Sequence, residues 1–373
     1  MTLMKAGEPL KTPTRLVSLD VFRGATIGAM ILVNTAGGWP GAWAQLKHSP
    51  WHGWTFTDTV FPSFLWIAGV AMTLSFARRV EKGDSRRRLL LHALRRAAIL
   101  FALGLLVYEF PHFDLKHLRI PGVLQRIAVC YFLGAVLFLY CGRRAIAIWT
   151  AALLAVYWIL VKLVPVPGVG AGVVDSPAGS FPQYVDLLLL RGFLYTPTWD
   201  PEGIVSTLPA LATLLLGVMA GYLLRSDRDA GEKTAWMFTA GNALLIAGAI
   251  LNIWLPINKN LWSSSFSEFM AGVSMSVFAF CYWVLDVQGW KWWSRPPAIL
   301  GMNAIAVYML SELGDSTLQW IPTAAGPLHR TLFARYTALF GPGLDSAMWG
   351  LSFDAVCLVV AWAMYRRGWF LRA

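Results

Sequence analysis

The 373-residue sequence is 57% hydrophobic and only 14% charged, a balance that excludes a water-soluble globular domain, in which about 25% of residues are charged. The formal net charge of +11 would suit a nucleic-acid-binding protein if the basic residues gathered on one soluble surface. They lie instead between long apolar segments, which indicates a membrane protein.

Long apolar segments follow one another along almost the whole chain. A membrane-spanning helix needs about 20 mostly apolar residues. The sequence predicts ten such helices, at residues 17–37, 56–77, 89–109, 120–140, 144–164, 203–224, 234–255, 262–286, 296–312 and 347–366. The ninth is short and polar for a span. We therefore predict an all-α polytopic membrane protein, with a short cytoplasmic tail at 1–14 and one transmembrane domain at 15–373.

The positions of Lys and Arg predict the orientation of these helices. If the N-terminus is cytoplasmic, most basic residues fall on the cytoplasmic side, in the tail and in or beside the links at 78–96, 143–144, 225–233, 291–295 and 366–372. This is the positive-inside bias, and contact with anionic headgroups of the lipid bilayer accounts for the net charge without nucleic acid. The opposite side carries three long segments, at 38–55, 165–202 and 313–346, and long loops are often functional.

Some polar side chains lie where the spans should be apolar. They are expected to face the interior of the bundle, because placing a charge in the bilayer costs about 2.5–3.5 kcal/mol. Asp20 and Arg23 are three residues apart in the first span, which is the spacing of an ion pair on one helix face. Asn34 lies on roughly the same face, nearer the outer end. Two interpretations stay open: an interfacial ion pair with a helix cap, or a polar stripe that lines a cavity.

The fourth span opens with polar residues after a Pro-Gly break. Arg126, which follows Gln125, needs either a structural carboxylate partner or an anionic ligand at that depth. Asp20 and Glu109 are the candidate partners. A structural ion pair and ligand binding both remain possible interpretations of this arginine.

The segment before the sixth span reads Trp-Asp-Pro-Glu-Gly. Asp200 is suited to capping the helix, Pro201 to its first turn, and Glu202 to a favourable interaction with the helix dipole. Capping alone explains the motif, and substrate binding is the alternative. In the ninth span, Asn303 and Glu312 are nine residues apart, a spacing that favours no metal geometry.

The segment 46–66 is the most unusual, because it combines histidines, an aspartate and tryptophans directly before an apolar helix. His48 and His52 have the spacing of zinc ligands on a helix, but Pro50 lies between them and no Cys or third His is close in the sequence, so we predict no metal site. The tryptophans are typical of an interfacial aromatic belt. His48 is suited to general acid–base catalysis, with Asp58 placed to orient its ring.

Several strings in the chain are together similar to one family. They are RLVSLDVFRG, VNTAGGW, KHSPWHGWTFTDTVFPSFLWIAG, RIPGVLQRIAVCYF, DPEGI, PINKNLWS and GMNAIAVY. They resemble the heparan-α-glucosaminide N-acetyltransferase family of transmembrane acyltransferases, in order over nearly the whole chain. The resemblance implies a dimeric, polytopic helical protein that moves an acetyl group from cytosolic acetyl-CoA to a glucosamine on the opposite side of the membrane.

The resemblance also implies the site residues. The family's active histidine lies in a Lys-His-x-x-Trp motif that matches His48, its membrane asparagine matches Asn34, and the aspartate before its Val-Phe-Pro motif matches Asp58. We expect these three to be catalytic, with Asn34 donating a hydrogen bond to the oxyanion. We expect the acetyl-CoA site to include Arg15, Asp20, Arg23, Gln125, Arg126 and Asn303, and the acceptor site to include Trp51, Asp200, Glu202, Asn258, Lys259 and Asn260.

The sequence departs from the animal members of the family, because we expect ten spans where those have eleven, and we expect no lumenal domain before them. The compact form resembles bacterial members. We therefore expect a homodimer in a bacterial inner membrane and a smaller glucosamine-type or cell-envelope acceptor. Two other functions stay open: O-acylation of an envelope glycan, and transport of an anionic small molecule by the same polar groups.

Overall fold

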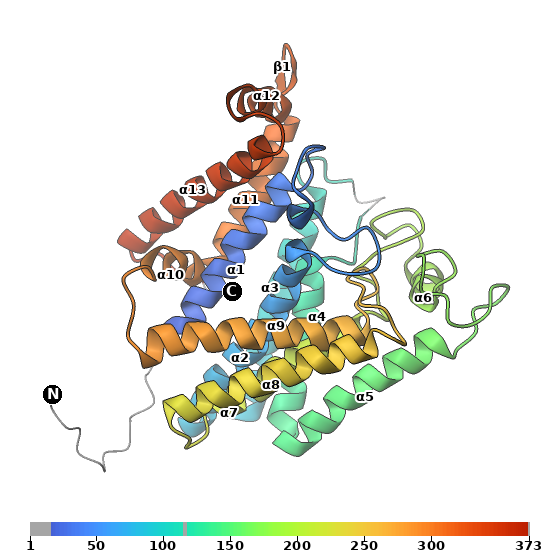
Figure 1. The fold of residues 1–373 in the computed structure, drawn as a ribbon, viewed down its shortest axis with the longest axis vertical. Helices are drawn as coiled ribbons and strands as arrows, with labels where there is room; N and C mark the ends of the chain where they lie inside the picture. Colours follow the sequence, from blue (N-terminus) through green and yellow to red (C-terminus); the bar gives the residue numbers. More distant parts are fainter. Residues whose placement is uncertain (1–15, 115–117, 372–373) are drawn as a thin grey trace.

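The computed structural model describes residues 16–114 and 118–371, so the expected tail at 1–14 and the predicted donor ligand Arg15 lie outside the described residues. Helices make up nearly all of the described regular structure (Figure 1). They are α1 (Val17–Ala36), η1 (Ala44–Leu46), α2 (Phe56–Glu81), α3 (Arg86–Glu109), α4 (Val123–Tyr140), α5 (Arg143–Lys162), α6 (Phe181–Leu190), α7 (Thr207–Leu224), α8 (Ala230–Leu251), α9 (Ser264–Tyr282), η2 (Trp283–Val287), α10 (Arg295–Met302), α11 (Ala304–Trp320), α12 (Leu328–Phe340) and α13 (Leu344–Arg366).

Within the described residues, nine helices are long and apolar enough to cross a membrane, namely α1, α2, α3, α4, α5, α7, α8, α13 and the continuous helix of α9 and η2. Each of them overlaps one of the predicted spans. The prediction of an all-α polytopic membrane protein is therefore confirmed.

The ninth predicted span is not one helix. The chain bends by 83° between α10 and α11, at Asn303, and α11 continues to Trp320. Asn303 is fully buried, where its amide donates to the carbonyl of Trp369 at 3.2 Å and accepts from the backbone of Leu371 at 3.1 Å. A break at membrane depth is tolerated where protein surrounds the backbone. The hydropathy pattern locates the apolar residues but not this break, so the bounds 296–312 were wrong.

Two glycines permit close contact between the central helices. A Cβ atom on Gly24 of α1 would lie 1.6 Å from the carbonyl oxygen of Pro297 in α10. One on Gly217 of α7 would lie 2.1 Å from the carbonyl oxygen of Trp66 in α2. Any larger side chain would push these helices apart, so the two glycines set the spacing of α1 on α10 and of α2 on α7.

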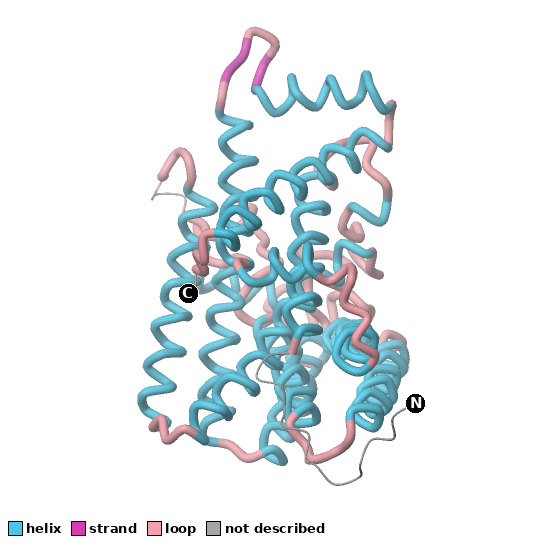
Figure 2. The backbone as a smooth tube through the Cα atoms, turned by 90° about the vertical axis from the view of Figure 1, so that its left-hand side faces the viewer, coloured by secondary structure: helices cyan, strands magenta, loops and turns pink. Residues whose placement is uncertain are grey.

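The two ends of the bundle differ. The links from α7 to α8 and from α9 to α10 lie on the left in Figure 1, and the segment with α6 lies on the right. We call the left-hand end, with the basic residues of 78–88 and 225–233, the basic end, and the opposite one the outer end. Segment 313–346 is not an irregular loop, because it holds the end of α11, a hairpin of β1 (Pro322–Thr323) and β2 (Gly326–Pro327), and α12, which project from the bundle in Figure 2.

Candidate active site

His48 and Asp58 form a close pair at the outer end, between α1 and the first turn of α2. Nδ1 of His48 lies 2.5 Å from Oδ1 of Asp58, and the other carboxylate oxygen accepts from the backbone amides of Ser49 and Thr55, each at 3.0 Å. Asp58 therefore caps α2 and holds the histidine segment at once. Because an ionised carboxylate only accepts, Nδ1 carries a proton, and in the neutral form of the ring the lone pair is then on Nε2.

The exposure of the pair leaves the histidine accessible. The side chain of Asp58 is fully buried, whereas that of His48 is 51% exposed. The imidazole ring is thus held by Asp58 at Nδ1, and the rest of the ring is accessible from outside the protein. An imidazole in this state can accept a proton through Nε2, which is what a general base requires.

Trp51 joins the histidine segment to segment 165–202. Its indole Nε1 donates to the carbonyl oxygen of Val174 at 2.8 Å, and its ring lies edge-on to Trp199 with 5.7 Å between ring centroids. The aromatic belt interpretation does not account for these contacts. They indicate that Trp51 shapes the outer surface beside His48, and contact with the acceptor stays a prediction.

The predicted acceptor residues Asn258, Lys259 and Asn260 form a turn between α8 and α9. Asn258 is fully buried, and its Nδ2 lies 3.3 Å from Nδ1 of His52. Nζ of Lys259 lies 3.8 Å from Oε1 of Glu202, and Asn260 is half-buried. This turn therefore ties the histidine segment to the segment before α7.

Asp200 and Glu202 belong to a buried ion network centred on Arg119, which the sequence analysis did not assign to the site. Arg119 donates to both oxygens of Asp200 at 2.9 Å and to Glu202 at 2.7 Å, and its guanidinium lies 4.5 Å from the ring centroids of Tyr108 and Tyr195. Burial opposes ionisation of Glu202, but the surrounding cations outweigh it and hold its pKa below the usual value. The capping interpretation is wrong, because α7 begins only at Thr207.

Arg126 is almost fully buried and holds the segment before α7. Its Nη2 donates to the carbonyl oxygens of Pro201 and Gly203, each at 3.1 Å, and to the hydroxyl of Ser206. Within the described residues, its hydrogen bonds are therefore with these oxygens and not with Asp20 or Glu109. Nε and Nη1 of Arg126 and the amide of the buried Gln125 have no hydrogen-bond partner within the described part of the chain. A cavity of about 750 Å³ opens at the basic end, and neither residue lines it, so their donor-binding role stays a prediction.

Asp186 of α6 is a buried acid near this network. One carboxylate oxygen accepts from the amide of Ile204 at 2.8 Å, and a Cβ atom on Gly203 would lie 1.8 Å from the other. Burial raises the pKa of Asp186 to about 6, from 3.8. The folded protein therefore binds this proton more tightly than the unfolded chain does, and stability that is present below pH 4 is lost as the pH rises through 6.

We expect Asp186→Asn to stabilise the protein above pH 6, by about 3 kcal/mol at about 1.4 kcal/mol per pKa unit. The asparagine keeps an acceptor for Ile204 and does not ionise. Thermal unfolding in detergent at pH 4 and pH 7 would measure the change, and the variant should lose most of the wild-type difference between the two pH values. A midpoint at pH 7 equal to that of the wild type would contradict this.

A cavity of about 750 Å³ opens at the basic end, between α1, α2, α3, α4, α10 and α11. Its basic lining consists of Arg23, Arg78, Arg79, Lys82, His92 and Arg96, and much of the remaining wall is apolar. Arg23 lies 3.5 Å from Asp20, as the spacing predicts. In the sequence, most of these basic residues indicate only the orientation of the helices, because nothing in their local pattern shows that they meet in one cavity.

One face of α1 continues from this cavity to Asn34. The residues of α1 that line the cavity along this face are Asp20, Arg23, Ile27 and Met30. Asn34 extends their alternating three- and four-residue spacing by one turn. At about 1.5 Å per residue, Asn34 lies about 16 Å beyond Arg23 along the helix. Asp20 and Arg23 therefore line the cavity, whereas Asn34 is exposed and is not one of its lining residues, so a polar stripe that reaches Asn34 stays a prediction.

Asn34 also contacts α11. Its Nδ2 donates to Oε1 of Glu312 at 2.8 Å. Tyr308, one turn before Glu312, lines the cavity. The sequence alone predicts no role for Glu312, because its partner is distant in the chain. The inner wall of the cavity thus ends close to this amide–carboxylate pair.

Asn34 and His48 lie on segments that touch. A Cβ atom on Gly37, three residues after Asn34, would lie 2.4 Å from the carbonyl oxygen of Leu46, two residues before His48. The end of α1 that carries Asn34 and the segment that carries His48 are therefore packed together.

Residues 15–256, well over half of the chain, match the family model described as heparan-alpha-glucosaminide N-acetyltransferase, catalytic. The chain belongs to this family. It is similar to the heparan-alpha-glucosaminide N-acetyltransferase of Homo sapiens, with 32% identity over 366 residues, 83% of this chain and 54% of that protein. The protein of the same name from Mus musculus is 31% identical over 364 residues, 82% of this chain and 55% of that protein. The chain spans about half the length of these curated relatives.

The family match confirms the resemblance seen in the sequence. It includes the segments with Asn34, His48, Asp58 and Arg126, and it ends before the turn at Asn258. Within the described residues, no group of three or more His, Cys, Asp or Glu side chains is arranged to hold a metal ion. The groups that the described site presents are the imidazole of His48, the carboxylate of Asp58 and the amide of Asn34.

Proposed function

We propose that this chain is a membrane-embedded acyltransferase that moves an acetyl group from acetyl-CoA to the amine of a glucosamine-type sugar. The observation that carries the proposal is the His48–Asp58 pair at one end of the bundle and the basic cavity of about 750 Å³ at the other, with Asn34 one turn beyond the last cavity-lining residue of α1. Membership of an N-acetyltransferase family supports it. The donor enters from the basic end and the acceptor from the outer end.

The cavity suits the donor chemically. The phosphates of CoA are anionic and its pantetheine arm is long and thin, so the basic residues bind the phosphates and the apolar wall takes the arm. Along α1 the arm then reaches the thioester position beside Asn34. The Asn34 amide has two N–H donors, of which Glu312 takes one, so the second serves the thioester oxygen.

In the proposed reaction the acceptor amine attacks the thioester carbonyl carbon. The new C–N bond forms, the C–S bond breaks, and CoA leaves. Nε2 of His48 takes the proton from the amine and passes it to the departing sulfur, while Asp58 stabilises the imidazolium. Asn34 stabilises the oxyanion. The same Nε2 also suits direct attack on the thioester, which breaks the C–S bond, releases CoA and gives an acetyl-histidine, from which the amine then takes the acetyl group.

We place the basic end and both termini in the cytoplasm, following the positive-inside bias, and the protein in a bacterial inner membrane as a homodimer, following the family resemblance. This arrangement supplies acetyl-CoA from the cytosol and places the sugar on the far side. Vesicles that hold the protein in one known orientation would test this sidedness. We expect acetyl-CoA added outside to be used only when the basic end faces outward.

One assay tests the function. Purified protein receives labelled acetyl-CoA and a panel of glucosamine-bearing acceptors, and both free CoA thiol and N-acetyl product are followed. We expect one thiol per product. Acetylation of hydroxyl groups only would favour O-acyl transfer, and ligand movement across vesicles without thiol release would favour transport. Thiol release before any acceptor is added would identify the acetyl-histidine route.

The basic lining of the cavity predicts which part of the donor it binds, namely the nucleotide. Replacing both Arg78 and Lys82 by Gln should raise the KM for acetyl-CoA by about 10- to 100-fold, because each charged hydrogen bond to phosphate contributes about 1.5–3 kcal/mol before solvent screening. The KM for S-acetyl-pantetheine, which lacks the nucleotide, should change little. Arg144→Gln on α5, which is exposed, is the matched control. Equal losses with both donors would place the nucleotide elsewhere.

A further inference from the structure

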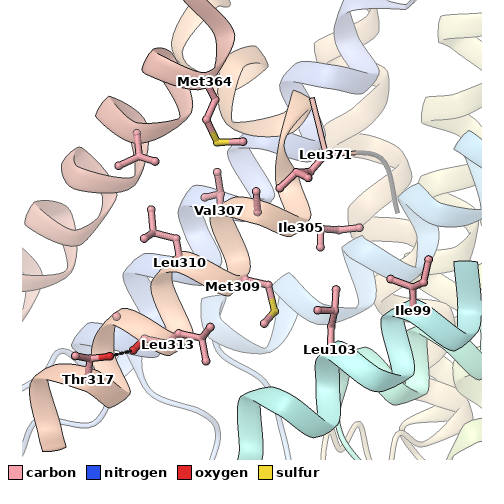
Figure 3. A pocket seen from close by; sticks show the side chains of 13 residues that line it. Ile99, Leu103, Ile305, Val307, Met309, Leu310, Leu313, Thr317, Met364 and Leu371 are labelled. Carbon is pink, nitrogen blue, oxygen red and sulfur yellow. Dashed lines mark hydrogen bonds between the residues drawn. The ribbon is translucent and has the colours of Figure 1, made fainter. Parts of the chain in front are cut away.

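A second cavity, of about 780 Å³, lies between α3, α11 and α13 (Figure 3). Among the described residues, no charged side chain lines it. The lining consists of Ile99, Leu103, Ile305, Ala306, Val307, Met309, Leu310, Leu313, Gly314, Thr317, Val360, Met364 and Leu371. Nothing in the proposed transfer reaction uses this groove.

The groove has a length comparable to that of a hydrocarbon chain of a membrane lipid. From Ile305 to Thr317 it follows α11 for about 18 Å, at about 1.5 Å per residue. The hydrocarbon core of a bilayer is about 30 Å thick, so the groove covers more than half of it. Its walls belong to α3, α13 and α11, of which the first two are long enough to span and the third belongs to the broken span.

Exposed arginines lie beyond the end of the groove that is nearer the basic end. Arg95 precedes Ile99 by one turn on the same face of α3. Arg367 closely follows Met364 at the end of α13, and it is exposed, as is Arg95. The guanidinium of Arg367 lies 5.1 Å from the ring centroid of Trp369. The side chain of Trp369 is 57% exposed, as expected of an aromatic anchor at the headgroup level. The apolar groove therefore ends beside positively charged side chains.

We propose that this groove binds one anionic glycerophospholipid, with an acyl chain along α11 and its phosphate between Arg95 and Arg367. The apolar lining selects the chain, and the two arginines select the negative headgroup. Ile305 and Leu371 line both this groove and the cavity at the basic end. The bound lipid therefore packs against the wall that separates it from the donor cavity.

Native mass spectrometry of the delipidated full chain tests the proposal, with dioleoyl-phosphatidylglycerol as probe and dioleoyl-phosphatidylcholine and inorganic phosphate for comparison. We expect one saturable phosphatidylglycerol adduct. Gly314→Trp fills the groove, and a Cβ atom there meets nothing within 4 Å, so this variant should fold and lose the adduct. Arg95→Gln and Arg367→Gln should each weaken binding about fivefold, because a basic residue near anionic lipid contributes about 1 kcal/mol.

The controls are Ile148→Trp, which adds the same bulk at a 69% exposed position of α5, and Arg144→Gln, which removes a charge elsewhere. Both should bind like the wild type.

An unchanged adduct in Gly314→Trp, equal retention of phosphatidylcholine, or equal binding of inorganic phosphate would each overturn the proposal. Conversion of a dimer to a monomer by Gly314→Trp, with no lipid adduct on the wild type, would show that a second copy covers the groove. Failure of acetyl transfer leaves this test unaffected, because it measures lipid alone.

Discussion

Replacing His48 with alanine is expected to lower the rate of acetyl transfer by about 100- to 10,000-fold, the usual contribution of a positioned general acid–base group. The loss is large because the half-exposed imidazole, held at 2.5 Å by a buried carboxylate, is the base in the proposed reaction. Turnover of labelled acetyl-CoA with a glucosamine acceptor measures it. Thermal unfolding in detergent should be close to that of the wild type, since Asp58 still accepts from the backbone of Ser49 and Thr55.

Two further variants separate catalysis from folding in this test. His112→Ala removes an exposed histidine after α3 and should retain activity. Asp58→Asn keeps an acceptor for the helix cap but no longer stabilises an imidazolium, so it should lower the rate and alter its pH profile while KM for acetyl-CoA changes little. Ordinary turnover in His48→Ala would remove the imidazole from the mechanism.

Asn34→Ala is expected to lower the turnover rate by about 100- to 1,000-fold, the range for loss of one oxyanion donor. The KM for acetyl-CoA should change less than threefold, about 0.7 kcal/mol, because the amide acts on the charge that develops during transfer. Single-turnover kinetics and equilibrium binding of acetyl-CoA measure the two quantities separately. An equal loss of affinity and rate would reduce Asn34 to a binding residue.

The bond between Asn34 and Glu312 provides the companion variant for this measurement. Glu312→Gln keeps a carbonyl acceptor for the amide and removes the carboxylate charge. If the carboxylate only positions Asn34, this variant should retain most of the rate that Asn34→Ala loses. Asn242→Ala removes an exposed amide from α8 and serves as the control for loss of an asparagine within a span.

Several features of the site are visible in the sequence because their signals are local. Asp20 and Arg23 are one turn apart, and their pairing at 3.5 Å follows from helix geometry alone. His48 and Asp58 are only ten residues apart, on either side of a helix start, so their pairing is a short-range event. The expected family is confirmed for the same reason, since its motifs are continuous strings.

Other features depend on residues that are far apart in the chain. Arg119 binds Asp200 across 81 positions, and Asn34 binds Glu312 across 278 positions. No periodicity in either segment predicts such pairs. The capping interpretation of Asp200 was wrong for this reason: the motif is compatible with a helix start, but a distant guanidinium takes the carboxylate instead.

The sequence by itself determined that the chain is a membrane protein of apolar helices with one basic end, because hydropathy and charge bias are sums over neighbouring residues. It also determined the family and the candidate catalytic residues. Only the tertiary structure decided the break at Asn303, the Arg119 network, and the meeting of basic side chains from α1, α2 and α3 in one cavity. Those depend on how helices pack against one another, and packing is specified by contacts between segments rather than by the pattern within any one of them.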